Sequence, residues 1–127
     1  MSEIHKGACH CGAVTFEISA PQFVVSCNCS ICRRYGALWA HCPPNEGAIL
    51  SGLDNLTTYS WGDHMIDFHG CKTCGCVTHW APGKAADQDR FALNMRMTSP
   101  AVVDALPVRH FDGADSWAFL DEPGRPR

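Results

Sequence analysis

Three cysteines lie within six residues, Cys27, Cys29 and Cys32, in the spacing C-x-C-x-x-C. Thiolates this close along a chain can bind one zinc ion together, whereas a disulfide between such near neighbours is strained. Structural zinc sites are closed by four protein ligands, while catalytic sites keep three and leave one position for water or substrate. This cysteine triplet therefore either requires a fourth ligand or forms a site with an open position.

Two further pairs of cysteines are spaced like metal ligands. Cys9 and Cys11 precede Gly12, and the sequence C-x-x-C-G from Cys71 to Gly75 is typical of a zinc knuckle at the tip of a β-hairpin. The two pairs can form one closed site of four sulfurs that joins an early loop to one about 60 residues later. This partition leaves the triplet with three thiolates and an open position.

A second partition stays open, in which the triplet gains a fourth ligand. The candidates are Cys42, Cys76, His41 and His69, and spacing does not decide between the partitions. We interpret Cys42 and Cys76 as small buried apolar residues, which is the common role of an isolated cysteine.

The composition indicates one globular domain. The chain has 127 residues, of which 46% are hydrophobic and 18% charged. A net charge of -3 argues against a nucleic-acid partner, which requires a basic face. No apolar run reaches the ~18 residues of a membrane helix, and residues 1–6 contain no apolar core of a signal peptide. We therefore expect a cytoplasmic protein without membrane contact, whose nine cysteines stay reduced.

Short runs of alternating or apolar residues predict a mainly β fold. Val14, Phe16 and Ile18 alternate with polar residues, which is typical of a half-buried strand. The extended runs that we expect are 13–19, 23–26, 37–42, 48–52, 56–61, 65–70, 76–80, 91–95 and 108–111. A single helical turn is expected at 31–36, with Ser30 as its N-cap, and a short helix at 102–106. Residues 121–127 contain Pro123, Gly124 and Pro126 and are expected to form a flexible tail.

These clusters, in this order, resemble the glutathione-dependent formaldehyde-activating (GFA) family, also called the CENP-V/GFA domain. The matching motifs are Gly7-x-Cys9-x-Cys11-Gly12-x-Val14-x-Phe16, then Cys27-x-Cys29-Ser30-x-Cys32-Arg33-Arg34-x-Gly36, then Cys71-x-x-Cys74-Gly75. The stretch from Pro107 to Trp117 is also similar to the C-terminal part of that family, so the resemblance covers about residues 5–120. One position departs from it, because Asn28 stands where the family usually has histidine.

The resemblance implies a fold, two zinc ions and an activity. The fold would be one of small stacked antiparallel β-sheets with zinc knuckles, the Mss-four-like fold. Cys9, Cys11, Cys71 and Cys74 would bind a structural zinc, and Cys27, Cys29 and Cys32 would bind a second, catalytic zinc. The activity would be that of a carbon–sulfur lyase, which reversibly joins formaldehyde and glutathione as S-(hydroxymethyl)glutathione. The partners would then be a small thiol and a small aldehyde.

A zinc ion with three thiolate ligands is electron-rich and a poor Lewis acid. We therefore favour delivery of a substrate thiolate over polarisation of the aldehyde carbonyl. Because glutathione is anionic, the site also needs cations, and Arg33 and Arg34 directly follow the triplet. Arg96 and Arg109 are further candidates, whereas Trp39, Trp61 and Trp80 are expected to pack in the core.

A second hypothesis comes from another functional class. The domain would be a non-catalytic, zinc-stabilised binding or chaperone-like module, since a fold alone does not fix a function. Such a module would need only the four-cysteine site, and the intact triplet beside two arginines argues against it.

Overall fold

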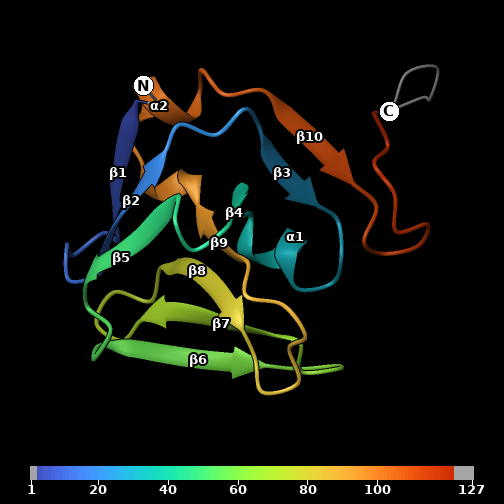
Figure 1. The fold of residues 1–127 in the computed structure, drawn as a ribbon, viewed down its shortest axis with the longest axis horizontal. Helices are drawn as coiled ribbons and strands as arrows, with labels where there is room; N and C mark the ends of the chain where they lie inside the picture. Colours follow the sequence, from blue (N-terminus) through green and yellow to red (C-terminus); the bar gives the residue numbers. More distant parts are fainter. Residues whose placement is uncertain (1–2, 122–127) are drawn as a thin grey trace.

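The computed structural model describes residues 3–121 and consists mainly of short strands (Figure 1). The strands are β1 Ile4–Ala8, β2 Thr15–Ser19, β3 Val24–Cys27, β4 Trp39–Cys42, β5 Gly47–Ser51, β6 Leu56–Ser60, β7 Ile66–Cys71, β8 Val77–Pro82, β9 Phe91–Asn94 and β10 Val108–Phe111. The helices are single turns: α1 Cys32–Tyr35, the 3-10 turn η1 Met95–Met97 and α2 Pro100–Val103. The mainly β fold with small sheets is thereby confirmed.

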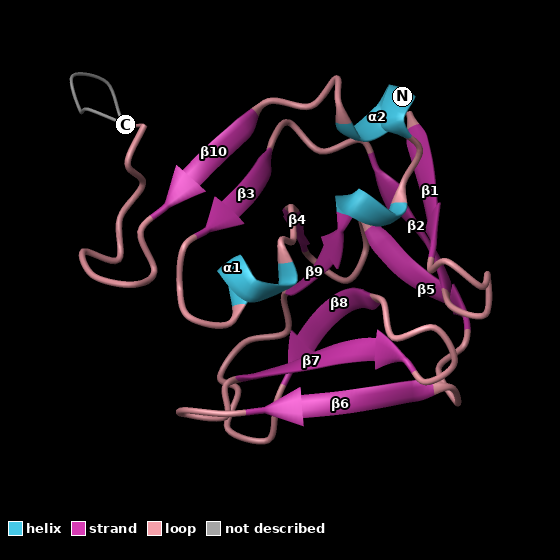
Figure 2. Ribbon diagram, turned by 180° about the vertical axis from the view of Figure 1, so that it is seen from behind, coloured by secondary structure: helices cyan, strands magenta, loops and turns pink. Residues whose placement is uncertain are grey.

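Seven of the strands form one sheet in the order β10-β3-β4-β9-β8-β7-β6. Strands β6, β7 and β8 follow one another in the chain and form an antiparallel meander at one end of the sheet (Figure 2). At the other end β10 pairs with β3 in parallel, so that Phe111 lies opposite Cys27. This parallel pair departs from the antiparallel order of the rest and brings the C-terminal part of the chain to the cysteine triplet.

Strands β1, β2 and β5 form a separate three-stranded sheet that packs on the larger one. The alternating side chains Phe16 and Ile18 of β2 are buried in a cluster with Leu93 and Met95. A Cβ atom on Gly7 would lie 2.3 Å from the Phe16 ring, so only glycine allows β1 to lie against that ring. Burial of the inner face of β2 thus fixes the loop that carries Cys9 and Cys11.

The structure corrects several of the local expectations. Strand β1 was not predicted, because its only buried residue is a glycine. Helix α1 begins after Ile31 and has no side-chain cap, so the prediction of Ser30 as N-cap was wrong. Helix α2 begins at Pro100 rather than at residue 102, since proline is favoured in the first turn.

Asp121, the first residue of the expected tail, has defined contacts. Its carboxylate accepts a hydrogen bond of 2.9 Å from the His110 backbone N–H and lies 3.7 Å from the Arg109 guanidinium. The remainder of that tail, 122–127, lies outside the described residues. Among residues 3–121 no helix has the length and apolar character needed to cross a membrane.

Candidate metal centres

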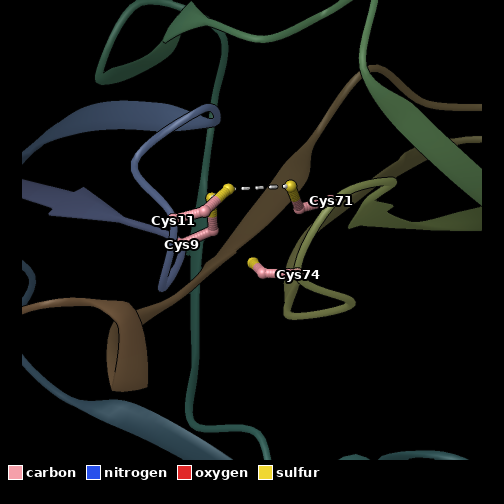
Figure 3. Close-up of side chains that lie close together, drawn as sticks. All are labelled: Cys9, Cys11, Cys71 and Cys74. Carbon is pink, nitrogen blue, oxygen red and sulfur yellow. Dashed lines mark hydrogen bonds between the residues drawn. The ribbon is translucent and has the colours of Figure 1, made fainter.

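The first candidate site contains four cysteines from two loops that are far apart in the chain. Cys9 and Cys11 follow β1, while Cys71 ends β7 and Cys74 lies in the turn between β7 and β8. All four side chains point toward one another (Figure 3). The sulfurs of Cys9 and Cys11 are 3.7 Å apart, and those of Cys11 and Cys71 are 3.6 Å apart. Tetrahedral zinc with bonds of about 2.3 Å requires sulfurs about 3.8 Å apart. The donor set and its spacing therefore fit zinc.

Each loop of this site turns at a glycine in the left-handed region. Gly12 has φ 83° and Gly75 has φ 80°, values that side chains with a Cβ rarely adopt. The turn after Cys9 allows the Val14 N–H to donate to its sulfur at 3.3 Å. The knuckle turn is closed by a hydrogen bond of 2.8 Å from the Gly75 N–H to the Cys71 carbonyl. The glycine that ends each cysteine pair thus shapes the loop around the sulfurs.

Backbone N–H groups favour the thiolate form of two cysteines in this cluster, which is the form that binds a metal ion. The N–H groups of Cys76 and Cys11 lower the pKa of the Cys74 thiol to about 5, and the Cys74 N–H lowers the pKa of Cys71. At Cys11 the Ala13 N–H lowers the pKa, but the neighbouring Cys71 thiol and desolvation together raise it to about 11. Four thiols cannot all ionise side by side without a cation, and a bound metal ion removes this conflict.

The second candidate site is the cysteine triplet, held between β3 and α1. Cys27 is the last residue of β3 and Cys32 the first of α1, and the three sulfurs lie within 4.8 Å of one another. The Cys32 N–H donates to the Cys29 sulfur at 3.4 Å, and the Trp39 indole N–H donates to the Cys32 sulfur at 3.4 Å. A hydrogen bond from the Cys32 thiol is the main cause that lowers the pKa of Cys27 to about 6. The same hydrogen bond, followed by burial, raises the pKa of Cys32.

No fourth cysteine, histidine or carboxylate joins the triplet among residues 3–121. Of the four candidates, Cys42 is buried in the core beside Leu93, and Cys76 packs near the four-cysteine site. His69 stacks on His79 with ring centroids 4.9 Å apart, and His41 lies against Trp80. The geometry therefore agrees with a partition of four plus three, with either cluster able to hold a metal ion.

The C-terminal segment covers one side of the triplet, a contact that the sequence did not reveal. The Asn28 side chain donates to Asp112 at 3.0 Å and accepts from the Ala114 N–H at 3.0 Å. A Cβ atom on Gly113 would lie only 2.6 Å from the Cys27 sulfur. Asn28 thus fixes residues 112–114 (the covering loop) against the triplet.

The arginines near the triplet differ in their contacts. Neither Arg33 nor Arg34 has a carboxylate within ion-pair distance among the described residues. The Arg34 side chain donates to the Ser30 carbonyl at 2.6 Å, whereas Arg96 donates to the Gly36 carbonyl at 2.7 Å and so holds the end of α1. Arg109 stacks on Phe119 with its guanidinium carbon 3.9 Å from the ring centroid, which is a structural contact.

The tryptophans also have separate roles. Trp39 and Trp80 are 1% and 6% exposed and pack in the cluster behind the triplet, as predicted. Trp61 is 43% exposed and borders a surface hollow with Arg34, so its assignment to the core was wrong. It directly follows β6, which is the last strand of the large sheet within residues 3–121. The sequence did not distinguish the three tryptophans, because edge position is a property of the sheet order.

Comparison with known proteins agrees with this geometry. Residues 4–104 match the family model described as glutathione-dependent formaldehyde-activating enzyme, a span that includes all seven clustered cysteines. A crystal structure of a Rhodobacter sphaeroides protein superimposes with a TM-score of 0.65 at 30% sequence identity. The match covers 81% of this chain and 98% of that one.

Proposed function

Because the chain belongs to the glutathione-dependent formaldehyde-activating enzyme family, we propose that it is a zinc-dependent carbon–sulfur lyase. It would add a small thiol, glutathione or a similar compound, to a small aldehyde such as formaldehyde. In that reaction a bond forms between sulfur and the carbonyl carbon, and the carbonyl π bond is lost. The thiol proton ends on the new hydroxyl group, so an S-hydroxymethyl adduct forms without an oxidant or reductant.

The observation that carries the proposal is the difference between the two clusters. Cys9, Cys11, Cys71 and Cys74 would hold a structural zinc with four sulfurs, while Cys27, Cys29 and Cys32 offer only three. A zinc ion bound by the triplet would supply an open coordination position at which a thiol is held as its thiolate. A purely structural centre has no use for this open position, so it supports catalysis over the non-catalytic binding or chaperone-like module.

The residues around the triplet would keep its thiolates fixed and ionised. The Trp39 indole N–H and the Cys32 backbone N–H each donate to a triplet sulfur, which stabilises negative charge there. Without metal, the Cys32 thiol donates to Cys27 and lowers the pKa of Cys27 to about 6, while the pKa of Cys32 is raised, so a bound zinc ion would have to displace the Cys32 proton. Phe68 and Trp80 form an apolar wall behind these groups and restrict water there.

Arg34 is the residue that we propose for the substrate carboxylate. Its guanidinium has five N–H donors, and the Ser30 carbonyl accepts from only one nitrogen of the group. Since Ser30 lies between Cys29 and Cys32, a carboxylate on Arg34 would be bound next to the triplet loop. Arg33 faces no carboxylate among the described residues, but it does not border the hollow beside Arg34.

The test is thiol–aldehyde exchange measured by magnetisation-transfer NMR on the S-hydroxymethyl adduct of glutathione. We expect wild-type protein to accelerate exchange above the buffer rate and Cys29→Ser to lose most of that acceleration. Cys42→Ser is the matched control, since Cys42 is a core residue outside both clusters. Exchange at the buffer rate with fully zinc-loaded wild-type protein would refute the reaction and favour the binding module.

A further inference from the structure

A surface hollow adjoins the triplet loop. It is lined by Ser30, Ile31, Arg34, Tyr59 and Trp61, and its volume is about 190 Å³. Ser30 and Ile31 are the two residues between Cys29 and Cys32, so one wall of the hollow is the triplet loop itself. The lining also includes Tyr59 of β6, the edge strand of the large sheet, and Trp61, which follows that strand. A ligand in the hollow would therefore lie beside the candidate catalytic centre.

The charged group of the hollow is available to a ligand. Arg34 is exposed, and no carboxylate among residues 3–121 lies within ion-pair distance of it. Its guanidinium donates a hydrogen bond of 2.6 Å to the Ser30 carbonyl, and this contact orients the group without neutralising its charge. Arginine binds carboxylates with two parallel hydrogen bonds, and this geometry selects a planar anion. The charge of the hollow thus specifies an anionic ligand.

The apolar wall of the hollow consists of two aromatic rings. Tyr59 is in the edge strand and Trp61 directly follows that strand, and they are 52% and 43% exposed. Exposed aromatic residues that gather with an arginine are typical of binding sites, where flat rings stack at little entropic cost. These rings therefore specify a flat apolar group next to the anion.

The size of the hollow limits the ligand further. A cavity of about 150 Å³ is enough for a benzene ring, so about 190 Å³ accommodates a ring with a small substituent. Pockets that enclose larger ligands have volumes of about 300 Å³ or more, so the hollow cannot enclose a tripeptide such as glutathione. The hollow matches one aromatic ring that bears a carboxylate.

We propose that Arg34, Tyr59 and Trp61 form a specificity subsite for an aromatic carboxylate group on the substrate. Resting on the proposed function, this inference makes the preferred aldehyde of the thiol–aldehyde reaction an aromatic compound that bears a carboxylate and is bound beside the triplet loop. Arg34 binds the carboxylate, and the rings of Tyr59 and Trp61 contact the aromatic face.

The binding test uses zinc-loaded protein and benzoate as the probe. Binding is followed by calorimetry and by the NMR signal of the Trp61 indole N–H, which is assigned with Trp61→Phe. We expect benzoate to shift that signal and to bind at least tenfold more tightly than cyclohexanecarboxylate or benzyl alcohol. Arg34→Gln should weaken benzoate binding about tenfold or more, and Tyr59→Ala about two- to tenfold. Arg33→Gln is the matched control for charge and should change the affinity less than twofold.

The activity test compares 4-formylbenzoate with benzaldehyde in thiol exchange. The subsite predicts a preference of about tenfold for the carboxylated aldehyde, which Arg34→Gln abolishes. The subsite would be overturned if Arg33→Gln and Arg34→Gln weakened benzoate binding equally, or if benzoate bound without shifting the Trp61 signal. Neither result would contradict thiol exchange itself. Benzoate binding without any thiol exchange would instead overturn the proposed reaction.

Discussion

A methyl group added at Gly113 should impair the triplet as a metal site. The Cβ atom of Gly113→Ala would lie 2.6 Å from the Cys27 sulfur and 3.2 Å from the Cys29 Cβ atom. The backbone at Gly113 lies outside the left-handed region, so alanine is disfavoured there by this contact alone. Without metal the Cys27 side chain can rotate away, but binding a metal with its two partners requires the sulfur in place. The steric conflict therefore acts mainly on metal binding.

The size of the effect follows from the cost of overpacking. An extra methyl group in a packed site costs about 1–3 kcal/mol, which corresponds to a metal affinity about 5- to 150-fold weaker. Zinc affinity would be measured by competition with a chromogenic chelator, together with the zinc content after dialysis. We expect two zinc ions in wild-type protein, and in Gly113→Ala one tightly bound zinc and one that is readily lost.

The control for this experiment is Ala114→Ser, which changes an exposed side chain in the covering loop and should retain both metals. The melting temperature of the metal-free protein should stay near the wild-type value, because without metal the Cys27 side chain can rotate away from the added methyl group. Gly113→Ala with two equally tight zinc ions would refute the contact between the covering loop and Cys27.

Three further predictions concern buried groups and the loops beside the triplet. Burial, followed by the neighbouring His69, lowers the pKa of His79 from 6.5 to about 4, so the unfolded state binds more protons below pH 6.5. Protonation of His79 should therefore reduce the free energy of unfolding by up to about 3 kcal/mol as the pH falls from 6.5 to 4. In urea unfolding, His79→Gln should not show this loss of stability at low pH. Trp39→Phe, which removes the N–H donor of Cys32, should weaken triplet zinc binding about tenfold in the same competition assay, while Trp80→Phe should not. Asn28→Ala should release the covering loop, seen as faster amide exchange at Ala114, and unchanged exchange there would contradict the role of Asn28.

Local patterns predicted most of the strands and both cysteine clusters. The alternation in β2 and the glycine after each cysteine pair are visible in the sequence, because a strand and a tight turn each depend on near neighbours. The sequence left open whether the triplet gains a fourth ligand, and the fold shows three cysteines there without one among the described residues.

The parts that escaped prediction depend on contacts between distant segments. Asn28 meets Ala114 across 86 residues through the parallel pairing of β10 with β3, and neither segment signals the other. The exposure of Trp61 follows from the position of β6 at the sheet edge, and strand order is not encoded in a local pattern. Strand β1 contains no alternating buried side chains and is defined by its partner β2.

The zinc content of Cys29→Ser tests the central claim most directly. The account requires two zinc ions per chain in wild-type protein, with four sulfurs around one and three around the other. Cys29→Ser should retain the fold by circular dichroism and one zinc ion, and it should lose thiol–aldehyde exchange. One zinc ion in wild-type protein, or collapse of the whole fold on this substitution, would contradict the assignment of the triplet as a separate catalytic centre.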